Sequence, residues 1–426
     1  MKIKVINKSY EEVCALPREK HLKPVKQSKL MRMTMKSLAA GELKATNFKC
    51  ETVGMEKLGK DEPALFLMNH SSFTDLMITS RLLADRQYHI IMTNDGFVGK
   101  AGLMQKVGCI PVRKFILDTD VIKDMIYVTK ELNSSVLMFP EASYSFDGTE
   151  TALPSSLGKF IKMLGVPVVM IRTKGAYLRD PLYNNLQKRN VDVSAVETYL
   201  LSKEDIAARS VDEINNLLSE AFKYNHFKEQ YEDGVLVDES FRADGLERPL
   251  YKCLCCKKEG QMLGQGTIIT CKACGDKHEL LEDGRLKRVE TGKGASDEIL
   301  SMEFVPDWYA WERKCIREEL NDENYSIDLD VDIMMLVDTK SMYKVGEGHL
   351  SHSKKGWRVT GCDGKIDFTQ TPKSSYSLYA DYFWYEIGDM IAIGDSKVQY
   401  YCFPKESFPV AKSRLATEEL YKIVNM

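Results

Sequence analysis

Five short apolar runs constrain the fold of this chain more than any other feature. They fall between residues 64 and 171 and read ALFLM, YHIIM, CIPV, SVLMF and VPVVMI. None of them alternates apolar with polar residues, as a strand with one solvated face would. Continuous apolar strands separated by helical stretches are typical of parallel sheets that helices cover on both faces. We therefore predict an α/β domain built on a mostly parallel sheet.

A histidine and an aspartate follow the first of these runs. The run ends at Asn69-His70, and Asp75 comes five residues after the histidine. We expect Ser72 to cap the next helix and Asp75 to occupy its third position, where the helix dipole favours a carboxylate. Such a carboxylate can hold His70 in one tautomer, so that the other ring nitrogen can accept a proton from a hydroxyl. Taken alone, the stretch fits a second interpretation at least as well as this one. In that interpretation, Asp75 only caps the helix, His70 is a loop residue, and the two side chains never meet.

Two further runs end in a charged residue. Arg113 follows CIPV, and Glu141 follows SVLMF after Pro140. The guanidinium of Arg113 is a planar fork suited to phosphate, and the carboxylate of Glu141 can accept hydrogen bonds from hydroxyl groups. Each residue is equally compatible with a plain surface charge at the end of a strand.

The order of these blocks resembles that of the glycerolipid acyltransferases, typified by 1-acylglycerol-3-phosphate acyltransferase. The shared blocks are His-x4-Asp, a strand ending in arginine, a Phe-Pro-Glu strand end and a Val-Pro strand. The resemblance implies that His70 is the general base on a glycerol hydroxyl and that Asp75 orients it. The oxygen would attack the thioester of acyl-CoA or acyl-carrier protein without an acyl-enzyme, and no catalytic cofactor is implied. It also implies that Arg113 and Glu141 bind the glycerol-phosphate acceptor.

The chain departs from the family pattern at two positions. Relatives usually read Phe-Pro-Glu-Gly-Thr-Arg-Ser, whereas this chain has Ala142 in place of the glycine and Tyr144 in place of the arginine. The second change removes a phosphate partner, and Lys100 and Lys114 are candidates to replace it. Acyl transfer to a lysophospholipid is the leading prediction, and transfer to an acceptor without phosphate is the alternative. A third possibility is a catalytically silent scaffold. The presence of His70, Asp75 and Glu141 argues against it.

A cluster of cysteines predicts a zinc ribbon. Two pairs with two-residue gaps are separated by fourteen residues, a spacing typical of four-thiolate zinc sites. With no open position, the zinc would be structural, and disulfides suit a cytosolic chain less well. Cys255 is a spare thiol, and we expect His278 to lie on the surface rather than to bind metal. The predicted ligands are Cys253, Cys256, Cys271 and Cys274.

These patterns predict three parts. Residues 1–245 form the acyltransferase domain and residues 250–287 the zinc ribbon. Residues 296–426 form a helical linker, with Asp307 as N-cap, and a small antiparallel β module closed by a helix. The alternating sequence SIDLDVDI is the period-2 signature of a half-buried strand. By element order alone, the module weakly resembles a pleckstrin-homology or GRAM domain.

The expected partners are an acyl donor, a lysophospholipid acceptor and a membrane surface. No run of 18 or more apolar residues is present, and the first residues lack the apolar core of a signal peptide. The net charge of −3 argues against a nucleic-acid partner. A basic, Met-rich helix over residues 18–36 either lies in an anionic membrane interface or packs its Met side on the domain. We expect a cytoplasmic protein, peripheral on the inner face of the membrane.

Overall fold

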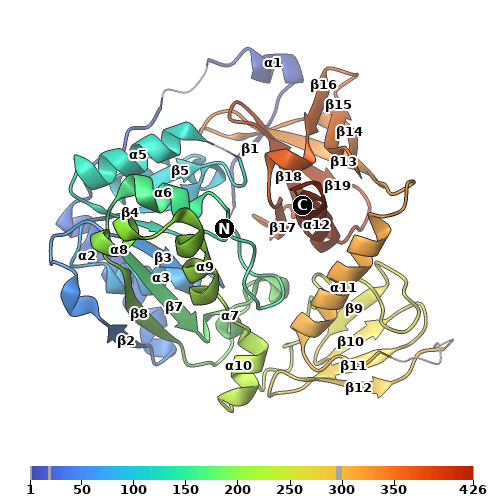
Figure 1. The fold of residues 1–426 in the computed structure, drawn as a ribbon. Helices are drawn as coiled ribbons and strands as arrows, with labels where there is room; N and C mark the ends of the chain where they lie inside the picture. The colour runs from blue at the N-terminus through green and yellow to red at the C-terminus, as the bar shows by residue number, and fades with distance from the viewer. Residues whose placement is uncertain (1, 18–20, 117, 294–299, 426) are drawn as a thin grey trace.

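The computed structural model describes residues 2–17, 21–116, 118–293 and 300–425. These residues form three sheets, of seven, four and eight strands, which follow one another along the chain (Figure 1). The mostly parallel sheet, the region of clustered cysteines and the antiparallel sheet closed by a helix are all present, so the predicted fold class is confirmed.

The seven-stranded sheet has the order β2-β8-β7-β3-β6-β4-β5. The five apolar runs form strands β3 to β7, of which β5 lies at one edge of the sheet. These five strands pair in parallel. Only β2 and β8 run in the opposite direction. The strands are β2 (Lys49–Val53), β3 (Leu65–Met68), β4 (Tyr88–Thr93), β5 (Cys109–Val112), β6 (Ser135–Met138), β7 (Val168–Lys174) and β8 (Ser194–Leu201).

Helices cover both faces of this sheet, which explains the unbroken apolar runs. Within β3, Leu65 and Leu67 belong to one hydrophobic core, whereas Phe66 and Met68 belong to the core on the opposite face. One core contains residues of α2, α3 and α7, and the other contains residues of α5, α6, α8 and α9. The helices are α2 (Lys29–Ala45), α3 (Thr74–Leu82), α4 (Ala101–Lys106), α5 (Thr119–Lys130), α6 (Leu157–Leu164), α7 (Ala176–Arg179), α8 (Lys203–Ala208), α9 (Val211–Ala221) and α10 (His226–Glu232).

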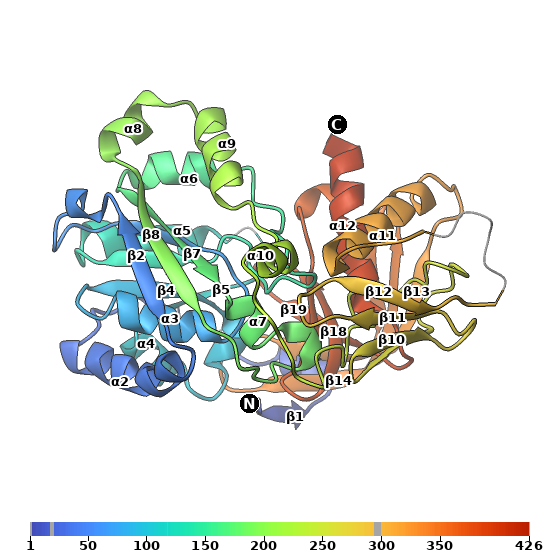
Figure 2. The same ribbon diagram turned by 90° about the horizontal axis from the view of Figure 1, so that it is seen from below.

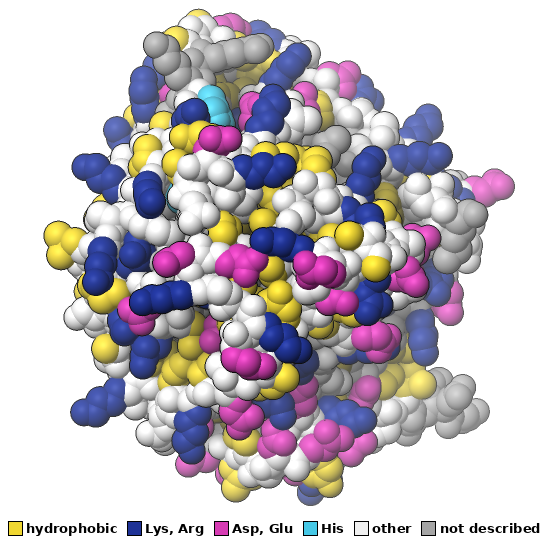
Figure 3. All heavy atoms as spheres, turned by 60° about the vertical axis from the view of Figure 1, so that its left-hand side comes forward, with side chains coloured by type: hydrophobic (Ala, Val, Ile, Leu, Met, Phe, Trp, Pro, Cys, Tyr) yellow, Lys and Arg dark blue, Asp and Glu magenta, His cyan; other side chains and the backbone are white. Residues whose placement is uncertain are grey.

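The N-terminal basic helix starts later than predicted. It begins at Lys29, where the Ser28 side chain accepts a hydrogen bond from the Met31 N–H, and residues 21–28 are not helical. The remaining predicted residues, 18–20, lie outside the described part of the chain. The helix exposes Leu30 and Leu38, which are 78% and 72% accessible. Figure 3 brings this half of the molecule forward and shows Lys and Arg side chains spread among hydrophobic ones.

The two remaining sheets are antiparallel, apart from one added strand. A four-stranded sheet of order β12-β11-β10-β9 carries the cysteines. In the last sheet, of order β16-β15-β14-β13-β19-β18-β17, the meander β13 to β16 and the meander β17 to β19 pair through β13 and β19. The three-residue strand β1 (Val5–Asn7) adds to the last sheet in parallel with β14, which no sequence pattern indicated. The strands are β9 (Met262–Gln265), β10 (Ile268–Cys271), β11 (Lys277–Leu280), β12 (Leu286–Glu290), β13 (Ile327–Leu336), β14 (Met342–Ser353), β15 (Gly356–Gly361), β16 (Ile366–Gln370), β17 (Tyr379–Trp384), β18 (Gly388–Gly394) and β19 (Gln399–Pro404).

Three more helices accompany these sheets: α1 (Tyr10–Cys14), α11 (Val305–Glu319) and α12 (Val410–Asn425). The prediction that Asp307 is the N-cap of α11 is wrong, because the helix begins two residues earlier, at Val305. Pro306 is tolerated in the first turn, where its missing N–H costs nothing. Asp307 instead occupies the third helical position and accepts a hydrogen bond from the Phe304 N–H at 3.0 Å.

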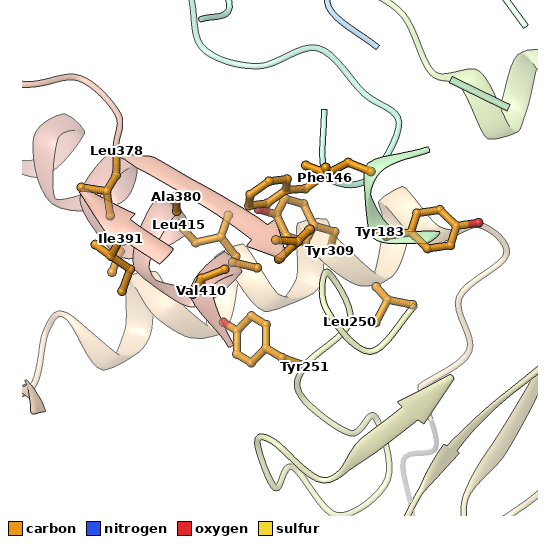
Figure 4. Packing of buried hydrophobic residues seen from close by; sticks show 14 of the residues in the cluster. Phe146, Tyr183, Leu250, Tyr251, Tyr309, Leu378, Ala380, Ile391, Val410 and Leu415 are labelled. Atoms are coloured by element: carbon orange, nitrogen blue, oxygen red, sulfur yellow. The ribbon is translucent and has the colours of Figure 1, made fainter. Parts of the chain in front are cut away.

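The last sheet and α12 pack against the loops at the carboxyl ends of β4, β5 and β6 (Figures 1 and 2). A single hydrophobic core continues from Phe146, in the loop after β6, through Tyr251 and Tyr309 to Leu415 on α12 (Figure 4). In open α/β sheets, ligands bind outside the carboxyl ends of the strands. The β module therefore covers the edge of the sheet where a functional site is expected.

Candidate active site

The loop after β3 brings His70 and Asp75 together. The His70 Nδ1 lies 3.1 Å from the Asp75 Oδ2, and the same oxygen accepts hydrogen bonds from the Ser71 N–H at 2.7 Å and the Ser72 N–H at 3.1 Å. An acceptor this close to Nδ1 favours a proton there and leaves Nε2 free to accept one. Asp75 is fully buried, whereas the side chain of His70 is 19% exposed.

The helix that carries Asp75 begins differently from the prediction. Phe73 is the N-cap of α3, so Asp75 is the second helical residue and not the third. Ser72 accepts a hydrogen bond from the Thr74 N–H at 3.2 Å and does not cap the third residue. The Asp75 carboxylate takes the free N–H groups of the turn itself, and this fixes the loop around His70.

Glu141 supports the same loop from the opposite side. Its Oε2 accepts a hydrogen bond from the His70 N–H at 2.9 Å, and its Oε1 accepts one from the Thr151 N–H at 2.8 Å. The hydroxyl of Tyr224 donates to both oxygens, at 2.8 and 3.1 Å. Burial raises the pKa of Glu141 to about 7, against the effect of these hydrogen bonds. The carboxylate thus faces the backbone of His70 and is 1% exposed.

The imidazole of His70 lies among aromatic rings. The ring of Phe139 stacks on it with centroids 4.0 Å apart, and the ring of Tyr144 lies at 4.3 Å. Tyr144 therefore occupies the surroundings of His70 with an aromatic face, where the family pattern has an arginine. Ala142 has a φ of 58°, in the left-handed region that glycine adopts most readily. The backbone at this position thus has a conformation that favours glycine, although a Cβ is present.

Of the other predicted residues, Lys114 is near enough for its charge to act on His70. The pKa of His70 is lowered by burial and, to a lesser degree, by the positive charge of Lys114, while Asp75 opposes both. Arg113 instead pairs with Asp118, at 3.0 Å between Nη1 and Oδ2. Among the described residues, no hydrogen bond or ion pair joins Arg113 to His70, Asp75 or Glu141. Lys100 lies at the residue before α4.

Sequence reasoning missed several residues that hold the site in place. The His226 Nε2 lies 3.1 Å from the Ser71 Oγ, and the Asn69 Nδ2 donates to the same oxygen at 3.1 Å. Tyr224 and His226 lie more than eighty residues beyond Glu141, and no local pattern links them to it. The one pattern in the sequence was a tyrosine followed two residues later by a histidine at the start of a helix. Such a pair is too common to indicate a functional site.

The four predicted cysteines form one cluster. The sulfur atoms of Cys253, Cys256, Cys271 and Cys274 all lie within 4.8 Å of one another, and two pairs are 3.7 Å apart. Tetrahedral zinc with Zn–S bonds of about 2.3 Å places its sulfurs roughly 3.8 Å apart, so these residues fit the ion. Cys255 is not part of the cluster. The prediction that His278 lies on the surface is wrong: it is 1% exposed because Trp308 covers it edge to face at 5.0 Å.

Comparisons with known proteins find a family model and a solved structure that each match part of this chain. Residues 49–174 match the model of the Acyltransferase family, so the chain carries an acyltransferase-family domain that includes His70, Asp75 and Glu141. Among solved structures, the chain is similar to the 1-acyl-sn-glycerophosphate (LPA) acyltransferase PlsC from Thermotoga maritima. The identity is 14%, the TM-score is 0.37, and the match covers 45% of this chain and 76% of that one. No curated protein matches the sequence.

Proposed function

We propose that this acyltransferase-family chain moves a fatty acyl group to a hydroxyl of a lysophospholipid such as 1-acylglycerol 3-phosphate, in phospholipid biosynthesis. The donor is acyl-CoA or acyl-carrier protein. The contact between His70 Nδ1 and Asp75 Oδ2 at the carboxyl end of β3, inside the family match, carries this proposal. A neutral imidazole held in this way has its second nitrogen free for general base catalysis.

The chemistry needs one proton to move twice. His70 Nε2 takes the proton of the acceptor hydroxyl while the hydroxyl oxygen attacks the thioester carbonyl. When the carbon–sulfur bond breaks, the same proton passes from His70 to the leaving thiolate, so no acyl-enzyme forms. Asp75 holds the Nδ1 proton and stabilises the imidazolium between the two transfers. Glu141 fixes the backbone of His70, and Lys100, Arg113 and Lys114 remain the candidate cations for a phosphate group.

A lysophospholipid acceptor requires contact with a membrane surface. Within the described ranges, no helix is long and apolar enough to cross a bilayer. The exposed Leu30 and Leu38 of α2, set between lysines, support binding in an anionic interface, as proposed for a cytoplasmic protein on the inner face of the membrane. The antiparallel strands and final helix of the last sheet support a pleckstrin-homology-like module with a docking role.

An acceptor panel tests the proposed reaction. The full-length protein is mixed with acyl-CoA or acyl-carrier protein and with lysophospholipids, glycerol phosphates, monoacylglycerol or neutral polyols, and products are identified by mass spectrometry. We expect an ester product with lysophospholipids. A product with neutral acceptors alone would favour the alternative suggested by Tyr144 in place of arginine. No ester with any donor and acceptor would contradict the proposal.

The titration of His70 provides a second test. Because burial lowers its pKa below 6.5, His70 is expected to stay neutral at pH 7 and to become protonated only in more acidic buffer. Replacing Lys114 by methionine removes a positive charge that lowers this pKa, so the midpoint should move upward. Nuclear magnetic resonance of protein labelled at histidine measures both values, and the signal missing in His70→Ala identifies the residue. A midpoint at or above 6.5 in the wild type would contradict a neutral base.

A further inference from the structure

Lys114 is a cation that makes no ion pair or hydrogen bond with the described residues. No carboxylate lies within 4.0 Å of its Nζ there, and no hydrogen-bond acceptor is in place. Its Nζ lies over the ring of Tyr379 on β17, 4.3 Å from the centroid. Burial lowers the pKa of Lys114, against the nearby carboxylates of Asp381 and Asp95. A partly buried cation without an acceptor is costly, and an anionic ligand would remove that cost.

Asp381 places a negative charge on the face of β17 that also contacts Lys114. It lies two residues after Tyr379 in β17, so both side chains project from one face of the strand, the face that meets Lys114. Its single hydrogen bond comes from the adjacent Tyr382 N–H, at 2.9 Å to Oδ1, and no cation of the described chain lies within 4.0 Å of it. A bulge begins at Asp381 and interrupts pairing with β18.

Contacts from two elements hold this part of β17 against the catalytic domain. On one side, Asp95 accepts hydrogen bonds from the Tyr379 hydroxyl at 2.7 Å and from the Trp384 Nε1 at 3.2 Å. On the other, Arg414 of α12 donates to the Ala380 carbonyl at 3.1 Å and to the Tyr144 carbonyl at 3.4 Å. Asp381 is therefore fixed relative to the loop that packs on His70.

The surroundings of Asp381 are aromatic. The loop that carries Tyr144 meets β17 beside Asp381, because Arg414 bridges the Tyr144 and Ala380 carbonyls and the rings of Phe146 and Tyr382 stack with centroids 4.3 Å apart. The Asp381 carboxylate also contributes to raising the pKa of Tyr144 and of Tyr385, although burial is the larger cause in both. Burial raises the pKa of Asp381 itself to about 6, with Lys114 and Arg414 opposing, so the carboxylate is mostly ionised at pH 7. Asp381, Tyr144, His70 and Lys114 each keep some accessible surface although protein surrounds them. A carboxylate flanked by aromatic rings is a setting that binds organic ammonium groups.

We propose, on the basis of the acyl transfer inferred above, that the acceptor is a zwitterionic lysophospholipid. Lys114 binds its phosphate, and Asp381 binds its ammonium on the side that faces the Tyr144 loop. An acceptor with phosphate alone leaves Asp381 unpaired, and a neutral acceptor leaves both charges unpaired. The last sheet, which lies outside the acyltransferase-family match, thereby selects the substrate.

A comparison of two acceptors tests this selection. The full-length protein is assayed with acyl-CoA and either lysophosphatidylethanolamine or lysophosphatidic acid of the same chain length. We expect a higher kcat/KM for the ethanolamine lipid. Asp381→Asn should lower that value about tenfold or more and leave lysophosphatidic acid unaffected or improved, since a hydrogen bond to a charged group is lost. Glu406→Gln, an exposed acid on the same module, is the matched control and should leave the ratio unchanged.

The outcomes separate this inference from the proposed function. If both acceptors are acylated and Asp381→Asn leaves their ratio unchanged, the zwitterion site is wrong and the acyl transfer stands. If wild-type protein acylates no lysophospholipid, the function itself is contradicted. Binding of two head-group probes to the wild-type protein by calorimetry covers the case in which the variant does not fold. Glycerophosphoethanolamine should bind more tightly than glycerol 3-phosphate, and the reverse order would overturn the inference.

Discussion

Alanine in place of His70 is expected to lower kcat/KM for acyl transfer by about 10²–10⁴-fold, the usual contribution of a positioned general base. The reason is local, because the imidazole held by Asp75 at 3.1 Å is the proposed proton acceptor at the carboxyl edge of the sheet. The measurement is the initial rate of ester formation at several acceptor concentrations. The loss should fall mainly on kcat, since the proton is transferred in the transition state and the acceptor is held by other groups.

A second histidine provides the matched control. His21 also pairs with a carboxylate, at 2.9 Å between its Nε2 and the Asp124 Oδ1, but that pair joins the N-terminal segment to α5. His21→Ala is expected to keep the wild-type rate. The ring of His70 packs on Phe139 and Tyr144, so the thermal midpoint of each variant must be recorded beside its activity. A folded His70→Ala variant with more than a tenth of the wild-type rate would contradict the assignment.

Removal of the metal is expected to have the largest effect on stability. Structural zinc contributes about 10–16 kcal/mol of apparent binding free energy in small zinc-finger peptides, and a four-cysteine cluster with no open position is of this structural kind. Cys253 and Cys271 are fully buried in the core that also contains Trp308 of α11 and Leu415 of α12. Chelation, or Cys271→Ser, should therefore lower the thermal midpoint of the ribbon and of the helices packed on it.

The neighbouring Cys255 makes this test specific. It is buried in the same segment but lies outside the cluster, so Cys255→Ser should keep one zinc per chain while Cys271→Ser loses it. Metal content is measured by mass spectrometry, and unfolding is followed by calorimetry with and without chelator. One zinc per chain and an unchanged midpoint in Cys271→Ser would show that these thiolates do not hold a structural ion.

The sequence predicted those features that depend on near neighbours. The parallel sheet was visible because each of its central strands is buried on both faces, as the alternation of Leu65 and Phe66 between two cores illustrates. The clustering of the cysteines follows from their spacing, whereas the pairing of His70 with Asp75 was expected only from the order of the family blocks. The caps predicted at Ser72 and Asp307 were misplaced by one and three residues, because a carboxylate near a helix start can accept N–H groups from several positions.

Features that depend on distant parts of the chain could not be predicted. The bond between Tyr224 and Glu141 joins residues 83 positions apart, and the contact of Arg414 with Tyr144 joins residues 270 positions apart. Neither carries a local signal, since both come from the packing of whole elements. The same holds for β1, whose three residues pair with β14 at the far end of the chain. The last sheet covers the edge of the parallel sheet that carries His70, and this arrangement also depends on tertiary packing and not on local sequence.

Acceptor-dependent release of thiol from acyl-CoA tests the central claim most directly. Full-length, zinc-loaded wild-type protein and His70→Ala are incubated with acyl-CoA, with and without lysophospholipid, and thiol release and ester product are measured together. We expect release that requires the acceptor, equals the ester formed and nearly disappears in the variant. Equal release in both proteins, or release without ester, would contradict direct transfer to a hydroxyl by His70.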